Sequence, residues 1–321
     1  MMAGPADELI DENRRKLINE LASVLGNPTI NSGTWTCLWF ADIERLQHLL
    51  DRCIVDHDFA GFVFGKLEGS KPSEMLKTWG ARSDQDSDEE SNVNTSSGKG
   101  KANDCRERYN STCLVTGFRE PIKVAHIYPH YMGEKSETEQ KTFWRTLRHF
   151  WSPAKVALWK EEILGPQGTE NCANLLTLSN ITQKLWEKAR FALRPMYAHE
   201  TMMWLQFFWL PRLKYIKSLL LTQMPPLFAP DLTSSDFEVN HPLPSIKLLR
   251  LQWTLHRVLA MSGVAEASDE DLDLFAGMGT GWVTGGWLGH VGGYEEMSDD
   301  ETGDEETVDD EKGEEVELKE A

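Results

Sequence analysis

Gln183 and Glu187 are two polar side chains whose types and spacing would allow them to share a chemical role. They stand four residues apart in a segment of helical periodicity, so both lie on one face of the predicted helix and can reach a single ion. A carboxylate is a good ligand for a hard ion such as Mg²⁺, whereas an amide oxygen is a weak one. Neither resembles the imidazole ligands of a strong Zn²⁺ site. The alternative is a solvated helix face with an ordinary Glu187–Arg190 ion pair.

Short runs with strand character precede this helix and must position it. Residues 113–116 and 122–127 are β-like, and the segment 117–121 between them contains the glycine and proline of a hairpin connection. His126 lies near the end of the second run. A lone histidine on a strand is more often structural than catalytic, and the residues alone leave both readings open.

The stretch 113–193 resembles the HNH endonuclease family, which has a ββα-metal fold, and in particular the HNH nuclease domains of fungal proteins. The motifs that carry the resemblance are CLVTGF, VAHIYPH and, after a long insertion, NLLTLSNITQKLWEKARFAL. It covers the middle third of the chain and neither end. The implied fold is α+β, with a hairpin-and-helix module embedded in a mainly helical domain.

The resemblance assigns roles to two of these residues. His126 stands at the position of the general base, which takes a proton from the water that attacks the phosphodiester, a task that suits imidazole. Asn174 fits the family asparagine that orients the histidine or helps to ligate the ion. Asn171 is a poorer candidate by spacing.

The sequence departs from the family at the metal ligands. Family members often have a histidine after eight intervening residues beyond the asparagine and another histidine after three more, at the positions where this chain has Gln183 and Glu187. Ala125 stands where many members have an acidic residue or a histidine. Because second-shell changes alone weaken metal sites by about 10–100-fold, the loss of these ligands is expected to weaken ion binding at least as much.

The implied activity is hydrolysis of DNA phosphodiester bonds with one divalent ion, for which Mg²⁺ suits the ligands better than Zn²⁺ or Ni²⁺. The alternative is a catalytically inactive module that binds nucleic acid or protein. Basic side chains near the motif can neutralise DNA phosphates, or simply form solvated helix faces. They are Lys184, Lys188, Arg190 and Arg194 around the motif helix, and Arg145, Arg148 and His149 in the insertion.

Three further patterns carry no function. His126 and His130 have metalloprotease spacing, but no glutamate follows the first and Pro129 argues against a helix. The glycine-rich stretch 277–293 lacks the Lys-Ser/Thr of a phosphate-binding loop. Cys113 has no second cysteine at ligand spacing, so it is expected to be a small buried residue.

The net charge of −18 is concentrated in two segments. Residues 295–321 contain 15 acidic and 2 basic residues, and residues 83–90 contain five acidic residues and no basic one. The rest of the chain is close to neutral, so a local basic groove for DNA remains compatible with the composition. The acidic tail is predicted either to engage a basic protein partner or to cover the DNA-binding surface.

Composition divides the chain into five regions and predicts an intracellular protein, nuclear or cytoplasmic. The five cysteines are expected to be reduced, no signal peptide is apparent, and no run of about 18 apolar residues occurs to cross a membrane. Helices are predicted over 6–25, 40–55, 136–164, 180–190, 213–222 and 245–262, and a strand pair over 191–196 and 202–209. The regions are 1–81 (helical), 82–110 (disordered acidic linker), 111–215 (HNH-like, with a helical insertion), 216–264 (helical) and 265–321 (disordered tail).

Overall fold

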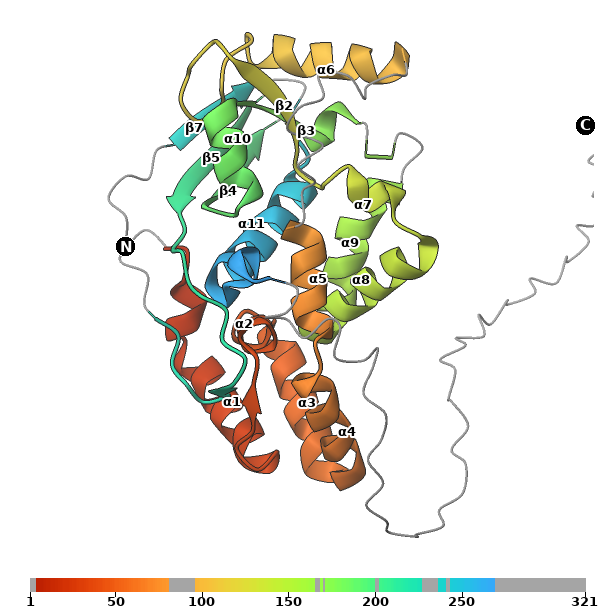
Figure 1. The fold of residues 1–321 in the computed structure, drawn as a ribbon, viewed down its shortest axis with the longest axis vertical. Helices are drawn as coiled ribbons and strands as arrows, with labels where there is room; N and C mark the ends of the chain where they lie inside the picture. Colours follow the sequence, from red (N-terminus) through yellow and green to blue (C-terminus); the bar gives the residue numbers. More distant parts are fainter. Residues whose placement is uncertain are drawn as a thin grey trace, which may run out of the picture. The chain divides into compact units, whose positions relative to one another are not determined.

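The computed structural model describes residues 4–80, 96–164, 168–169, 171–199, 202–226, 236–240 and 243–268. Met1–Gly279 makes one compact unit. Helices predominate in it, alongside small antiparallel sheets (Figure 1). The α+β class predicted from the sequence is confirmed. Among the described residues, no helix has both the length and the apolar character needed to span a bilayer.

The N-terminal part is helical, as predicted, but its first helix is interrupted. Asp11 leaves the helical conformation, and its carboxylate accepts a hydrogen bond from the Arg14 amide at 2.7 Å, which caps a new helix. The predicted helix over 40–55 is confirmed from Ile43 onward. The elements are η1 (Asp7–Ile10), α1 (Glu12–Val24), β1 (Thr29–Ile30), α2 (Ser32–Trp39), α3 (Ile43–Val55), α4 (His57–Glu68) and α5 (Lys71–Gly80).

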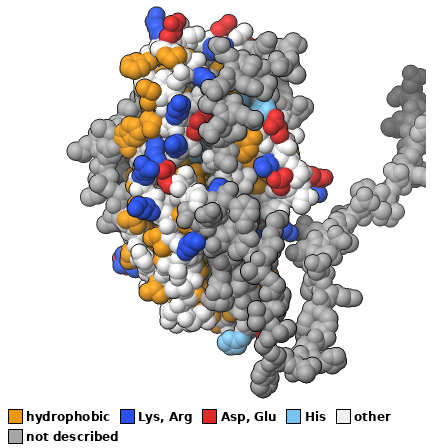
Figure 2. Space-filling model, viewed as in Figure 1, with side chains coloured by type: hydrophobic (Ala, Val, Ile, Leu, Met, Phe, Trp, Pro, Cys, Tyr) orange, Lys and Arg blue, Asp and Glu red, His pale blue; other side chains and the backbone are white. Residues whose placement is uncertain are grey.

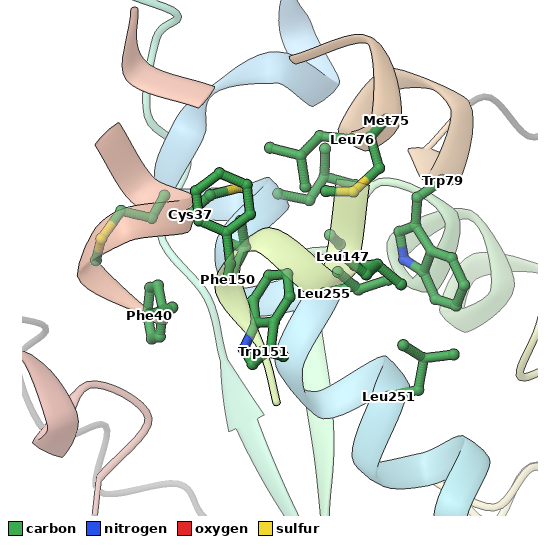
Figure 3. Packing of buried hydrophobic residues seen from close by; sticks show 14 of the residues in the cluster. Cys37, Phe40, Met75, Leu76, Trp79, Leu147, Phe150, Trp151, Leu251 and Leu255 are labelled. Atoms are coloured by element: carbon green, nitrogen blue, oxygen red, sulfur yellow. The ribbon is translucent and has the colours of Figure 1, made fainter. Parts of the chain in front are cut away.

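Helix α11 (Ile246–Ser262) runs through the centre of the unit and is buried along most of its length. Ser245 caps it by accepting a hydrogen bond from the Leu248 amide at 3.3 Å. Side chains from α2, α5, α8 and α11 gather in one core, in which Trp79 and Trp151 are fully buried (Figure 3). One continuous core therefore joins the N-terminal region, the middle of the chain and the C-terminal helix.

The buried Arg257 of α11 is neutralised by Glu8. Its Nη1 donates to the Glu8 carboxylate and, at 3.2 Å, to the Pro5 carbonyl. Burial raises the pKa of Glu8, but the charge of Arg257 and its hydrogen bond outweigh this effect, so the net pKa of Glu8 is lowered. A carboxyl whose folded-state pKa is lowered contributes stability above its unfolded pKa, and this contribution is lost as the pH falls.

Glu8→Gln is therefore expected to lower the free energy of unfolding at pH 7. The difference from the wild type should shrink as the pH falls below about 4, where the unfolded carboxyl takes up its proton. Urea unfolding at pH 7 and at pH 3.5 measures this difference. The control is Glu12→Gln, which removes a well-exposed carboxylate paired with Arg15 at 3.5 Å. A Glu8→Gln deficit that is the same at both pH values would contradict the expectation.

A ββα module forms in the middle of the chain, with different strands from those predicted. Strand β2 (Ile122–His126) pairs antiparallel with β3 (Leu175–Ser179), and α10 (Asn180–Glu187) follows. The predicted hairpin between 113–116 and 122–127 is wrong. Residues 113–118 close into a turn, in which the Cys113 amide donates to the Phe118 carbonyl at 2.7 Å and the Gly117 amide donates to the Cys113 carbonyl at 2.9 Å. This turn lies beside β3, because the Leu114 amide donates to the Thr177 carbonyl at 2.9 Å.

The insertion between β2 and β3 is helical, as predicted. It contains α7 (Tyr131–Glu134), α8 (Glu137–Phe150), α9 (Pro153–Leu164) and η3 (Cys172–Asn174). Ser136 and Glu139 form a capping box at the start of α8. Pro153 begins α9, at a position where its missing amide hydrogen costs no helical bond.

The second sheet confirms the predicted strand pair and adds a third strand. Its antiparallel order is β4 (Phe191–His199), β5 (Met202–Trp209) and β7 (Asp236–Asn240). The predicted helix over 213–222 is wrong. The chain there is irregular until β6 (Leu219–Leu220), which pairs with β1. The irregular segment before β6 is held by hydrogen bonds to α2, since the Ser32 amide donates to the Ile216 carbonyl at 2.8 Å.

The predicted disordered linker is also wrong over its second half. Helix α6 (Ser96–Arg108) occupies it and places Cys105 in the core, with Tyr109 directly after the helix also buried. Arg108 donates to the Cys172 carbonyl at 3.1 Å and to the Leu175 carbonyl, which ties α6 to the start of β3. The predicted disorder of the tail is wrong over its first residues, because η4 (Val264–Glu266) follows α11 and Glu266 forms ion pairs with Arg190 and Arg212. The predicted disorder of 82–95 and of the tail from residue 269 lies outside the described residues.

Candidate functional site

His126 is the last residue of β2 and lies opposite Leu175 of β3. The indole Nε1 of the buried Trp186 donates to the His126 carbonyl oxygen at 3.4 Å. This bond holds the end of β2 against α10, at the residue that directly precedes Glu187. The imidazole is half-buried, and its ring centroid is 5.5 Å from that of His130. A partly accessible imidazole on a rigid strand end is suited to accept a proton from water.

Asn174 is 1% exposed and acts as a clamp between the two strands. Its Oδ1 accepts a hydrogen bond from the Tyr128 amide at 2.7 Å, and its Nδ2 donates to the carbonyls of Tyr128 and Thr169, both at 2.9 Å. The Asn174 carbonyl also accepts from the Ile127 amide at 2.8 Å. Asn174 thus fixes the chain that leaves His126, whereas Asn171 caps η3 by accepting from the Ala173 amide at 3.1 Å.

Helix α10 brings Gln183 and Glu187 together, as their spacing predicts. Ser179 caps the helix, and Thr182 and Trp186 are buried beneath it. Gln183 and Glu187 are half-buried beside this face, and Gln183 Nε2 donates to Glu187 Oε1 at 2.9 Å. The carboxylate and the amide therefore meet at one point of the helix surface.

Cys113 is 1% exposed, and its side chain links the turn over 113–118 to α10. Its Sγ accepts a hydrogen bond from the Thr116 amide at 3.4 Å and lies 3.7 Å from Thr182 Oγ1. Burial raises the pKa of this thiol, but these hydrogen bonds outweigh the burial and lower the net pKa. All five cysteines are free, as predicted, and Cys113 has the expected buried position.

The motif implies a divalent ion, whose ligands the side chains of this site would have to supply. Among the described residues, no three His, Cys, Asp or Glu side chains converge as a metal site. The Asn174 amide is used by backbone groups, which leaves the Glu187 carboxylate and the Gln183 amide. This pair does not fit Zn²⁺, which takes three or four protein ligands. Mg²⁺ requires fewer protein ligands, because it is commonly held by one or two carboxylates together with waters and substrate phosphates. Ala125 is buried and offers no ligand.

The predicted DNA-binding cations do not form one surface. Lys184 on α10 and Lys188 directly after its end are exposed. Arg190 instead forms an ion pair with Glu266 and is only 16% exposed, so the alternative pairing with Glu187 is not what the structure shows. Arg145 and Arg148 are exposed on α8, which Figure 1 places on the other side of α11 from α10.

Sequence reasoning missed the residues that hold the site in place. Trp186 and Arg108 donate to the backbone of β2 and β3, and Thr169 completes the Asn174 clamp. A signal was present for Trp186, because it lies between the two candidate ligands at the spacing of the buried face. No local signal marked Arg108, since its segment is almost free of apolar residues.

Comparison with known families agrees with the geometry. A family model described as HNH endonuclease matches residues 113–194, which include β2, the helical insertion, β3 and α10. No curated protein and no solved structure matches the chain.

Proposed function

We propose, from the premise that residues 113–194 form an HNH endonuclease-family domain, that this protein is a divalent-metal-dependent endonuclease acting on DNA. The observation that carries the proposal is the fixed position of His126. The Asn174 clamp and the Trp186 indole hold the end of β2 against the helix that bears Gln183 and Glu187.

His126 acts as the general base in this proposal and takes a proton from the attacking water. Asn174 and Trp186 contact its backbone neighbourhood and keep the imidazole in place, so they are positioning residues. Glu187 and Gln183 would hold Mg²⁺ together with a DNA phosphate. The ion, when bound, supplies charge stabilisation at the phosphate and at the leaving oxygen.

The second candidate is a catalytically inactive HNH-like domain that binds nucleic acid or protein. Two features of position 183 favour the inactive domain. Gln183 stands where the family often has a histidine, and its amide donates a hydrogen bond to the Glu187 carboxylate that would otherwise be open to an ion. The two candidates differ in one measurable property, the cleavage of DNA.

Nicking of supercoiled plasmid by the full chain tests the proposal. Reactions with Mg²⁺, Mn²⁺, Ni²⁺ or Zn²⁺ are compared with a reaction in chelator. Cleavage with Mg²⁺ or Mn²⁺ that chelator abolishes supports the endonuclease. DNA binding without cleavage under every metal supports the inactive module.

Gln183→His is expected to restore a stronger metal site. An imidazole adds a first-shell ligand, so Ni²⁺ or Zn²⁺ should bind at least about tenfold more tightly, and cleavage should increase. Isothermal titration with each ion measures the affinity. Gln183→Ala is the matched control, because it removes the hydrogen bond to Glu187 without adding a ligand. Equal metal affinity of the two variants would remove position 183 from the metal site.

A further inference from the structure

We propose that Arg212 and Lys214 extend the DNA-binding surface of α10 into a continuous track for the DNA backbone. Both residues lie outside the matched domain, and neither was recognised from the sequence, which predicted a helix from residue 213 onward. The inference rests on the proposed function, because it takes the ligand to be DNA.

The segment after β5 is joined directly to the end of α10. The Leu210 amide donates to the Arg190 carbonyl at 2.8 Å. Glu266 then bridges Arg190 and Arg212, and Arg212 Nη2 lies 2.6 Å from the Glu266 carboxylate. The end of α10 and the start of the segment 210–217 therefore lie next to each other.

The backbone that carries the new cations is fixed. Gly263 has a φ of +71°, and a Cβ at this position would lie 2.2 Å from the Lys214 carbonyl carbon, so the segment packs directly on the end of α11. The Ile216 amide donates to Ser32 Oγ at 3.0 Å. Cations on a fixed backbone lose less entropy when they bind phosphate than cations on a mobile loop.

The exposure and charge of this surface suit a polyanion. Arg212 and Lys214 are exposed, while Leu213 and Tyr215 between and beside them are half-buried. Figure 2 shows Lys and Arg side chains gathered on the face that carries α10 and the segment after β5. A hollow of about 450 Å³ is lined by Arg212, Lys214, Tyr215 and Glu266, which gives a sugar-phosphate unit room to approach both cations. Glu266 is 22% exposed and is shared between two arginines, so it does not reverse the local charge.

Two phosphate contacts have a measurable signature. Each neutralised phosphate contributes about 0.9 to the slope of log affinity against log salt for duplex DNA. Removing both cations should therefore reduce the slope by about 1.8 and should weaken binding most at low salt. A role for these residues in folding alone would not change the slope.

The double variant Arg212→Gln/Lys214→Gln tests the track. Fluorescence anisotropy measures the Kd of the full chain for a labelled duplex at several salt concentrations. Arg52→Gln/Lys141→Gln is the matched control, because it removes one exposed arginine from α3 and one exposed lysine from α8, neither of which is a candidate DNA-binding residue. The expected result is a shallower slope for the first variant and an unchanged slope for the control.

The outcomes separate this inference from the proposed function. Equal slopes for the wild type and the Arg212/Lys214 variant would overturn the track, and so would an equal reduction in the control. Plasmid nicking by the wild type is measured in parallel. If the wild type nicks the plasmid but the slopes are equal, the endonuclease proposal is supported and the track is rejected. If the Arg212/Lys214 variant has a shallower slope but the wild type never cleaves DNA, the track is supported and only the catalytic proposal is rejected.

Discussion

Replacing His126 with alanine is expected to reduce the rate of metal-dependent plasmid nicking by about 10²–10⁴-fold, the usual contribution of a positioned general base. The affinity for duplex DNA should change little, because the cations that we propose to contact phosphates lie on α10 and on the segment after β5. The fold should also survive, since the half-buried imidazole is not part of the core and the Trp186 bond is made to the backbone carbonyl.

The matched control for this variant is His149→Ala, which removes an exposed imidazole from α8, away from α10. Its nicking rate should remain close to that of the wild type. The assignment of the base to His126 fails if the His126→Ala protein cleaves within about threefold of the wild type, since a lost base costs far more. Circular dichroism of each variant shows that the comparison is made between folded proteins.

The sequence predicted well those elements whose pattern is local. Helix α11 has a serine cap and an apolar periodicity, and β4 and β5 are dense in aromatic and apolar residues, so each could be recognised from its own segment. The segment 213–222 shows the limit of this reasoning. Its apolar residues have acceptable helical spacing, but contacts with Ser32 and with β1 decide its conformation.

Strand pairing could not be predicted from local pattern. The partner of β2 is β3, which follows it only after the three helices of the insertion. A turn at 117–121 made the nearest β-like run the natural candidate, yet residues 113–118 bond to themselves and to Thr177. Long-range pairing of this kind depends on how the inserted helices pack, and a single sequence does not encode that in any short window.

In the candidate site, too, the residues with a local pattern could be predicted and their distant partners could not. The family motif and the i, i+4 spacing identified His126, Asn174, Gln183 and Glu187, and the structure brings the last two into hydrogen-bond contact. The partners that set the electrostatics are distant in sequence. Arg190 was expected to face DNA or to pair with Glu187, but it forms its ion pair with Glu266, which is 76 residues away in the sequence. Such pairs follow from tertiary packing, and only the structure reveals them.

Asn174→Ala is expected to cause a large loss of stability, because this side chain holds three backbone groups. The substitution leaves the Tyr128 amide, the Tyr128 carbonyl and the Thr169 carbonyl without their partners. Tyr128 is 1% exposed, so water cannot readily replace the amide side chain. Each buried polar group left unsatisfied costs about 1–3 kcal/mol, so the two buried groups of Tyr128 alone should lower the free energy of unfolding by about 2–6 kcal/mol, whereas the bond to the Thr169 carbonyl is only partly buried. Urea unfolding followed by tryptophan fluorescence measures it.

The same substitution should also reduce cleavage, because the bonds that it removes fix the chain immediately after His126. Asn171→Ala is the control, since it removes only a cap on η3 and should cost about 0.5–2 kcal/mol. If Asn174 positions His126, the Asn174→Ala protein should nick DNA more slowly than the wild type even without denaturant, where the variant is fully folded. The Asn171→Ala protein should nick DNA at a rate close to that of the wild type. If the two variants lose equal stability and equal activity, the Asn174 side chain is an ordinary loop residue, and the strand end that carries His126 must owe its position to Trp186 and the β2–β3 pairing alone.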